Sequence, residues 1–169
     1  MPSGNERWLK VSIGSQRLTL FEGRHPLRDW PVSTALNGPG ELMDSGCTPR
    51  GEHRVKLMIG RGCSSGTVFV GRRPTGEVYG EALAARHPKR DWILSRIIWL
   101  TGIQSGYNRG GRCDTLRRFV YIHGCPDSAP MGVPLSHGCV RMRNVDVIEL
   151  FGLIERGTRV VIADDGDGP

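Results

Sequence analysis

The sequence predicts a mainly β domain that contains two helices. Short segments along the chain alternate apolar and polar residues with the period of two that is typical of strands. Turns separate these segments, and 24 glycines and 11 prolines supply them. A length of 169 residues with 38% hydrophobic content suits one domain with a sizeable core. We expect this domain to span residues 1–163, followed by a flexible acidic tail over residues 164–169.

The first half of the chain is predicted to consist of strands and turns. Residues 8–13 (WLKVSI) and 16–21 (QRLTLF) alternate on either side of Gly14-Ser15, which indicates a β-hairpin. Because proline disfavours the centre of a sheet, Pro31 places the next strand at an edge or at its own start. The further strands expected in this half cover residues 29–36, 52–59 and 67–71.

Residues 80–106 interrupt this pattern and contain the first predicted helix. The apolar side chains of residues 91–100 (DWILSRIIWL) recur near helical spacing. Aromatic and aliphatic stripes of this kind usually pack into a core. We therefore expect a core-packing helix over residues 91–100.

The last third of the chain combines a buried strand with the second predicted helix. Residues 118–123 (RFVYIH) are largely β-branched and aromatic, which predicts a strand that carries His123 at its end. Asn144 is expected to cap a helix over residues 144–156. Residues 158–163 (TRVVIA) are expected to form the closing strand.

The formal charge of +6 and the pI of about 9.4 permit an anionic peptide, an anionic membrane or a nucleic acid as partner. The basic residues are scattered, however, and no known nucleic-acid-binding motif accompanies them, so we expect no nucleic acid. Eighteen uncharged apolar residues never occur together, so we expect no membrane-spanning helix. The N-terminal sequence has no signal-peptide run and the five cysteines have no framework spacing. We expect a cytoplasmic protein, or a periplasmic one if an export signal has been removed.

The tripeptide His-Gly-Cys occurs twice within residues 121–142 (YIHGCPDSAPMGVPLSHGCVRM), and this repeat predicts a thiol active site. A free thiol has a pKa of about 8.5, so it needs a partner imidazole to ionise at neutral pH. We expect Cys139 to be the nucleophile and His123, sixteen residues upstream, to be its base. The backbone N–H of Gly138 is then a candidate oxyanion donor. His137 lies only two residues from the thiol, and either catalytic support or a structural role fits it.

A zinc site is the alternative interpretation of the same residues. His123, Cys125, His137 and Cys139 form a chemically acceptable set of two imidazoles and two thiolates. One residue between paired ligands matches neither zinc-ribbon nor zinc-finger spacing, so we expect no metal at this site. The remaining cysteines, at positions 47, 63 and 113, are given no role.

The combination of His123-Gly124 with residues 136–142 (SHGCVRM) resembles the catalytic signature of the L,D-transpeptidase catalytic domain family. The likeness extends to a Thr-Pro-x-Gly turn at residues 48–51 and covers most of the chain. It implies a β-sandwich of two mixed sheets with a few helices. It also implies that Cys139 is the nucleophile, that His123 is the base and that the Gly124 carbonyl orients this imidazole.

The resemblance implies roles for further residues. Arg141 is expected to bind a substrate carboxylate through its forked guanidinium, and Ser136 is expected to contact the substrate as well. Cys125 departs from the family pattern, because many members have a small residue without a thiol there. Relative to the smallest family members, residues 80–114 look like an insertion that shapes the substrate groove.

The family acts on the stem peptides of peptidoglycan, so the resemblance implies an acyl-thioester on Cys139 and no metal or organic cofactor. Water then gives carboxypeptidation, and an amine acceptor gives transpeptidation. Since we expect a cytoplasmic protein, we predict a cysteine L,D-carboxypeptidase that removes the terminal D-alanine from tetrapeptides during muropeptide recycling. An L,D-transpeptidase that cross-links or exchanges D-amino acids is the first alternative. A non-catalytic module that binds peptidoglycan fragments is the second.

Overall fold

The computed structural model describes residues 4–165, and strands dominate it. The predicted mainly β fold with a few helices is therefore confirmed. The strands are β1 (Arg7–Ser12), β2 (Arg17–Glu22), β3 (His25–Pro31), β4 (Gly51–Ile59), β5 (Thr67–Val70), β6 (Arg73–Val78), β7 (Ile93–Gly102), β8 (Tyr121–Cys125), β9 (Val140–Arg143) and β10 (Arg159–Ala163). The helices are α1 (Glu81–Arg86), α2 (Asn144–Leu153) and the short 3₁₀ helix η1 (Gly111–Cys113). Of the predicted tail, residues 166–169 lie outside the described part of the chain.

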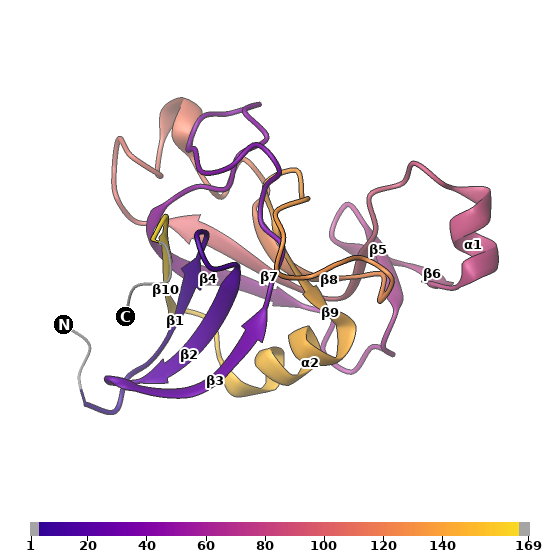
Figure 1. Ribbon diagram of the computed structural model, residues 1–169, viewed down its shortest axis with the longest axis horizontal. Coiled ribbons are helices and arrows are strands. Elements are labelled where there is room, and N and C mark those ends of the chain that lie inside the picture. Colours follow the sequence, from indigo (N-terminus) through magenta and orange to yellow (C-terminus); the bar gives the residue numbers. More distant parts are fainter. Residues whose placement is uncertain (1–3, 166–169) are drawn as a thin grey trace.

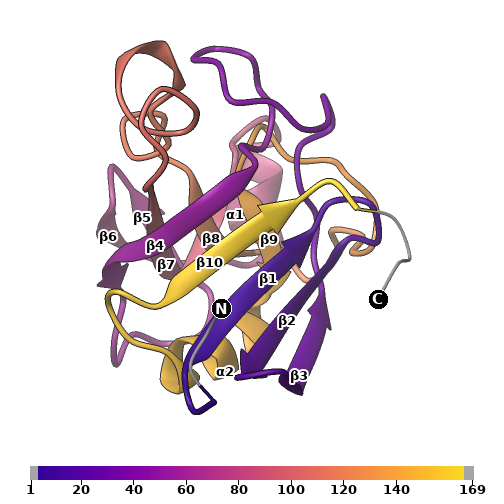
Figure 2. The ribbon, with the colours of Figure 1, turned by 90° about the vertical axis from the view of Figure 1, so that its left-hand side faces the viewer.

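The strands form one mixed, curled sheet. Its order is β3-β2-β1-β10-β4-β7-β5-β6, and β8 and β9 branch from it because β8 pairs with β7 and β9 pairs with β8. The β1–β10 and β8–β9 pairs are parallel, and the other strand pairs are antiparallel. Figure 2 shows β4, β10, β1, β2 and β3 side by side in one arm of the sheet, with β7, β8 and β9 behind them. The two layers expected of a sandwich are thus two arms of one hydrogen-bonded sheet.

The main hydrophobic core lies between these two arms and α2, which packs against β7, β8 and β9. In Figure 1, α2 lies below the strands and next to β9. Each large apolar side chain that leaves water on folding contributes roughly 1.5–3 kcal/mol, so this core fixes the strands that carry the site. Its fully buried members include Leu9, Leu20, Leu100, Ile122, Met142 and Leu150.

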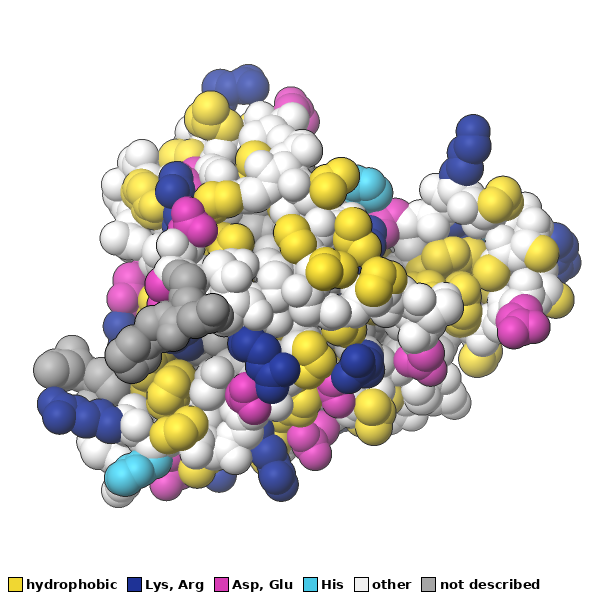
Figure 3. All heavy atoms as spheres, viewed as in Figure 1, with side chains coloured by type: hydrophobic (Ala, Val, Ile, Leu, Met, Phe, Trp, Pro, Cys, Tyr) yellow, Lys and Arg dark blue, Asp and Glu magenta, His cyan; other side chains and the backbone are white. Residues whose placement is uncertain are grey.

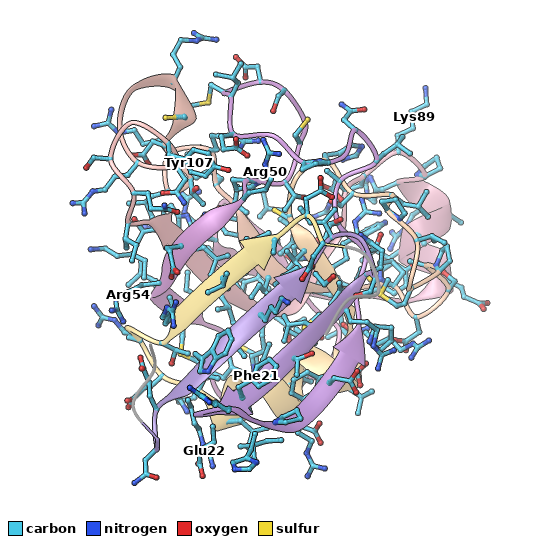
Figure 4. The ribbon with its side chains drawn as sticks, turned by 60° about the vertical axis from the view of Figure 1, so that its left-hand side comes forward. Phe21, Glu22, Arg50, Arg54, Lys89 and Tyr107 are labelled. Atoms are coloured by element: carbon cyan, nitrogen blue, oxygen red, sulfur yellow. The ribbon has the colours of Figure 1, made fainter. Side chains whose placement is uncertain are left out.

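The predicted N-terminal hairpin is confirmed, because β1 and β2 pair antiparallel with Trp8 opposite Phe21. The two rings stack with 4.6 Å between their centroids. Figure 4 shows Phe21 of β2 and Arg54 of β4 on the outer face of the sheet arm that β4, β10, β1, β2 and β3 form. The strands predicted over residues 52–59, 67–71 and 158–163 are also confirmed, as β4, β5 and β10.

The helix predicted over residues 91–100 is wrong, because this segment forms β7. β7 pairs with β4, β5 and β8 and is buried along most of its length, so its apolar run reflects burial on both faces. The apparent helical spacing arises where the register with β8 shifts between Leu94 and Ile97. Ser95, within this bulge, has a φ of +72°. The segment 80–114 therefore contains a central strand of the fold.

Three element boundaries also differ from the prediction. β3 ends at Pro31 instead of continuing to residue 36. β8 begins at Tyr121, because Phe119 adopts a left-handed φ of +56° that an extended strand excludes. Helix α2 begins at Asn144 and ends at Leu153, and its N-cap is Arg143, so the capping role predicted for Asn144 is wrong.

The side chain of Asn144 instead ties three segments together. Its Nδ2 atom donates to the Cys125 carbonyl and to Asp127, and its Oδ1 atom accepts from the Ser95 hydroxyl. These bonds fasten the start of α2 to the end of β8 and to the bulge of β7. The asparagine thus holds the base-bearing strand in place.

Helix α1 lies with β5 and β6 in an arm that projects from the body of the domain (Figure 1). Sequence analysis did not predict this helix, although its residues EALAAR are good helix formers. Leu83 of α1 packs against Val68, Trp92 and Leu94 in a second, smaller core. The arm is therefore anchored to β5 and β7.

Basic and acidic side chains are interspersed over the face shown in Figure 3, which has no continuous basic tract. Such mixed charge does not form the basic stripe that tracks a nucleic-acid backbone. Between residues 4 and 165, no helix combines the length and the apolar character needed to cross a membrane.

Candidate active site

Two neighbouring parallel strands bring the predicted nucleophile and base together. β8 pairs with β9 in parallel, and His123 lies opposite Arg141. The same register places Cys139, which directly precedes β9, beside Tyr121. Because side chains alternate along a strand, these four project from one face of the sheet, while Ile122 enters the core.

These four side chains line a cavity of about 320 Å³. This volume lies at the low end of the range for small-molecule sites. The side chains of Ser136 and His137, from the loop before Cys139, also line it. The other charged and aromatic members of its wall are Phe69, Arg72, Asp91, Arg118 and Phe119.

The imidazole of His123 is buried, and its Nδ1 atom lies 2.6 Å from the Gly124 carbonyl oxygen. Burial lowers the pKa of His123, although the Gly124 carbonyl opposes this shift. Gly124 has no room for a side chain, since a Cβ atom there would lie 2.5 Å from the Leu94 carbonyl oxygen and 2.6 Å from Asn144 Oδ1. The glycine thus allows β8 to pack closely while its carbonyl holds the imidazole.

The thiol of Cys139 lies between a backbone group at the start of β8 and one just before that strand. The Tyr121 N–H donates to Sγ at 3.3 Å, and the thiol donates to the Phe119 carbonyl at 3.4 Å. Burial raises the pKa of the Cys139 thiol to about 11, against the opposing effect of the Tyr121 N–H. Burial thus favours the uncharged form of both the thiol and the imidazole.

The backbone around the nucleophile is held by buried hydroxyls. Ser136 Oγ donates to the Cys139 carbonyl at 2.6 Å and accepts the Gly138 N–H at 3.2 Å. Thr48 Oγ1 donates to the Gly138 carbonyl at 2.9 Å. Gly138 has a φ of +134°, and a Cβ atom there would lie 3.2 Å from the Cys47 carbonyl oxygen. In this resting arrangement the predicted oxyanion donor is already paired with Ser136.

A charged cluster lies at the rim of the cavity. Arg141 Nη2 lies 3.2 Å from one carboxylate oxygen of Asp91, and His137 Nδ1 lies 3.6 Å from the other. His137 is 77% exposed, whereas the side chain of Arg141 is 17% exposed. A substrate carboxylate that binds Arg141 must therefore compete with Asp91.

The sequence profile of the L,D-transpeptidase catalytic domain (YkuD) matches residues 6–162. The chain belongs to the L,D-transpeptidase catalytic domain family. "Putative L,D-transpeptidase YkuD" of Bacillus subtilis is 51% identical over 154 residues, which are 91% of this chain and 64% of that protein. Its counterpart in Bacillus licheniformis is 46% identical over 155 residues, with the same shares. The chain thus spans 64% of the length of these curated relatives.

Solved structures share the fold of this L,D-transpeptidase domain. Bd1075 of Bdellovibrio bacteriovorus superposes with a TM-score of 0.59 at 17% identity, over 94% of this chain and 48% of that one. L,D-transpeptidase 3 of Mycobacterium tuberculosis, in complex with a faropenem-derived adduct, superposes with a TM-score of 0.56 at 16% identity. The match covers 94% of this chain and 60% of that one. At these identities the likeness supports the fold alone.

The second thiol of the doubled motif, Cys125, is separated from this chemistry. It is buried and donates to the Met142 carbonyl at 3.3 Å, and burial raises its pKa to about 11. Among residues 4–165, no three histidine, cysteine or acidic side chains are grouped so that they could hold a metal ion. The doubled His-Gly-Cys motif therefore places one thiol in the cavity and the other in the packed interior.

Sequence reasoning missed several residues of this candidate site. Asp91 was assigned to a helix, so its place at the cavity rim was not expected. Arg118 donates to the carbonyls of Gly40 and Cys47, which fastens the 37–48 loop to the turn that precedes β8. Neither residue belongs to a local motif. Thr48 did have a signal, since it opens the Thr-Pro-x-Gly turn.

Proposed function

We propose that the protein is a cysteine acyltransferase that acts on the stem peptides of peptidoglycan and works as an L,D-carboxypeptidase. The observation that carries this proposal is the placement of Cys139 and His123. His123 on β8 and Cys139 directly before β9 both line one cavity, and the Gly124 carbonyl holds the imidazole through Nδ1. This geometry supplies a nucleophile, a base and a fixed orientation for the base.

The reaction begins at the carbonyl of an L-configured centre that precedes a D-residue. Cys139 Sγ bonds to the carbonyl carbon while the thiol proton moves to His123 Nε2. The tetrahedral intermediate collapses as this proton passes to the leaving amine, which departs with the D-residue. An acyl-thioester remains on Cys139. Water, activated by the neutral imidazole, attacks the thioester and returns the free thiol and the shortened peptide.

We assign the surrounding residues to supporting roles in this reaction. The Gly138 N–H serves as an oxyanion donor once it exchanges its bond to Ser136 for the developing charge. Ser136 contacts the substrate and also positions the loop. Arg141 binds a substrate carboxylate in competition with Asp91, and His137 closes the exposed side of the cavity.

Hydrolysis is the fate that we favour for the thioester. A cavity of about 320 Å³ accommodates the end of one peptide more readily than a donor and an acceptor peptide together. All five cysteines are free thiols, which is the expected state in a reducing compartment. The free thiols support our proposal that the protein works in the cytoplasm, where soluble muropeptides are the available substrates.

Transpeptidation is the second candidate, because the curated relatives bear the name L,D-transpeptidase. The deciding experiment offers a tetrapeptide that ends in D-alanine, with and without an excess of a D-amino acid, and identifies the products by mass. We expect tripeptide and free D-alanine with little exchange. Predominantly exchanged or cross-linked product would overturn the carboxypeptidase assignment and leave Cys139 and His123 in their roles.

A non-catalytic binding module is the remaining alternative, and a covalent probe separates it from an enzyme. A carbapenem offers an activated carbonyl to the thiol, so a catalytic Cys139 should be acylated selectively over the other four cysteines. Iodoacetamide provides a second, smaller probe of the same thiol. A protein that merely binds fragments would show no selective acylation of Cys139.

A further inference from the structure

Three arginines line the active-site cavity, and they differ in their partners. Arg141 is paired with the carboxylate of Asp91. Arg118 donates to two backbone carbonyls and to the hydroxyl of Ser45. Both guanidinium groups therefore already meet oxygen acceptors of the protein itself.

Arg72 is the third arginine, and aromatic side chains surround it. Its guanidinium carbon lies 5.0 Å from the centroid of Trp99 and 4.9 Å from that of Phe119. Its Nη1 atom donates to the Tyr121 hydroxyl at 3.2 Å. The ion pairs formed within residues 4–165 do not include Arg72. Stacking on flat rings leaves the remaining N–H groups of the planar fork available to an incoming anion.

The backbone at Arg72 has an unusual conformation. The turn between β5 and β6 places Gly71 at a φ of +56° and Arg72 at +64°. Tight turns of this kind favour glycine, asparagine or aspartate at both central positions. An arginine in the left-handed region is maintained where the surroundings fix it, and such strained residues cluster at functional sites.

The position of Arg72 relative to the thiol identifies the part of the substrate that it faces. The Tyr121 N–H contacts Cys139 Sγ, and the hydroxyl at the far end of the same side chain contacts Arg72. One tyrosine, which is about as long as two extended residues, therefore lies between the guanidinium and the thiol. When the terminal residue is removed, the leaving side contains only one residue. A carboxylate at this distance must lie on the side of the peptide that becomes the acyl group.

We propose that Arg72 binds a carboxylate on the acyl-donor side of the stem peptide, about two residues from the carbonyl that Cys139 attacks. This inference rests on the proposed function. It makes Arg72 a specificity-determining residue, because a charge-assisted bond inside the cavity discriminates a carboxylate from a carboxamide. The alternative role is a clamp in which Arg72 only fastens the β5–β6 hairpin to Trp99 and Phe119.

The test measures kcat/KM for tetrapeptides in which single carboxylates are replaced by carboxamides, one position at a time. We expect one acyl-side replacement to lower kcat/KM of the wild-type protein roughly 10- to 100-fold. In Arg72→Gln, the acid and the amide should react at the same, low rate. Arg73→Gln is the matched control, because Arg73 is exposed on the same hairpin, and it should discriminate as the wild-type protein does.

Two results would overturn this role for Arg72. The first is a wild-type protein that turns over every carboxamide peptide as well as the acid. The second is an Arg72→Gln protein that keeps the wild-type ratio of kcat/KM for the acid to kcat/KM for the carboxamide, which is the result expected if Arg72 is only a clamp. If circular dichroism shows that Arg72→Gln does not fold, Arg72→Lys replaces it in the experiment. The acid-to-carboxamide ratio of kcat/KM for Arg72→Lys should lie between the wild-type ratio and the ratio of one expected for a neutral variant. Unchanged discrimination in Arg72→Lys would contradict recognition by the fork.

Failure of the underlying function has a separate signature. If the wild-type protein forms no thioester at Cys139 with any stem peptide, the proposed function fails and the role of Arg72 fails with it. If the thioester forms at the same rate whether the acyl-side group is a carboxylate or a carboxamide, only the role of Arg72 fails.

Discussion

The Nδ1 atom of His123 lies 2.6 Å from the carbonyl oxygen of Gly124, the next residue in the chain. A carbonyl oxygen only accepts hydrogen bonds, so Nδ1 carries the proton and Nε2 is left as the acceptor. A backbone group thus performs the orienting task that a carboxylate performs in many nucleophile–histidine sites. Because this group belongs to a buried strand, the orientation of the base depends on the packing of β8.

Substitution of Gly124 tests that dependence. A Cβ atom would meet the Leu94 carbonyl oxygen at 2.5 Å, so Gly124→Ala must shift β8 and with it the carbonyl that holds His123. We expect the free energy of unfolding to fall by about 1–3 kcal/mol, as for other overpacked sites, and kcat/KM to fall strongly. Gly152→Ala is the control, because nothing lies within 4 Å of a Cβ atom there. In helix α2 this change should raise stability by about 0.5–1 kcal/mol. Wild-type activity in a folded Gly124→Ala protein would contradict the role of this carbonyl.

The two cavity histidines are predicted to differ in their effect on catalysis. His123 is buried and held by Gly124, whereas His137 is 77% exposed and lies beside the rim residue Asp91. Loss of a general base lowers rates by roughly 10²–10⁴-fold, which we expect of His123→Ala, against less than about tenfold for His137→Ala. Steady-state kinetics on the tetrapeptide decides between them. The reverse order would move the base to His137.

The pH dependence of kcat/KM should report a neutral resting pair. Burial lowers the pKa of His123, so the imidazole stays unprotonated and able to accept a proton at pH values below its ordinary value of about 6.5. Burial also raises the pKa of the Cys139 thiol to about 11. The rate should therefore fall only below about pH 6.5 and stay level up to about pH 9. An optimum near neutrality with a decline by pH 8–9 would indicate a thiolate–imidazolium pair instead.

A second buried histidine makes folding stability depend on pH. His53 is fully buried, with Nδ1 3.0 Å from the Gly51 carbonyl oxygen and Nε2 3.0 Å from the Thr115 hydroxyl. Burial lowers its pKa to about 4. Between about pH 6.5 and pH 4 the unfolded chain therefore binds a proton that the folded chain does not. Stability should fall as the pH falls through this window.

Denaturant unfolding at pH 7 and pH 4 measures that loss. From 1.4 kcal/mol per pKa unit, we expect His53 to contribute a decrease of up to about 3 kcal/mol. His53→Gln should reduce the loss of unfolding free energy between pH 7 and pH 4 by about this amount. His25→Gln, on the exposed edge strand β3, should leave that loss unchanged. An unaltered slope in the His53 variant would show that other groups cause the acid sensitivity.

The elements predicted correctly are those whose local pattern matches their tertiary surroundings. The β1–β2 hairpin has one face in the core and one in solvent, so its residues alternate. β7 violates this condition because it is covered on both faces, and a short, continuously apolar run does not distinguish a strand from a buried helix. The bulge at Ser95 added an apparent helical spacing. The missing information was the pairing of β7 with three other strands, which is a non-local property.

The sequence allowed prediction of those site residues that lie in one continuous motif. Cys139 and His123 come from a single stretch of chain, and the parallel pairing of β8 and β9 places them on one face. Asp91 and Arg72 come from distant segments that carry no motif, and tertiary packing alone brings them to the cavity. Asn144 shows the opposite case, because its position next to a helix suggested a cap while its side chain bonds to Ser95 and Cys125.

The most direct test of the proposed chemistry is the intact mass of the protein after a short incubation with the tetrapeptide and an acid quench, followed by peptide mapping. We expect an adduct with the mass of the tripeptide minus one water, located on Cys139. Cys139→Ala should form no adduct and release no D-alanine. Cys125→Ala should keep both, because Cys125 is buried and bonded to the Met142 carbonyl. An adduct on Cys125, or steady release of D-alanine by Cys139→Ala, would contradict the assignment of Cys139 as the nucleophile.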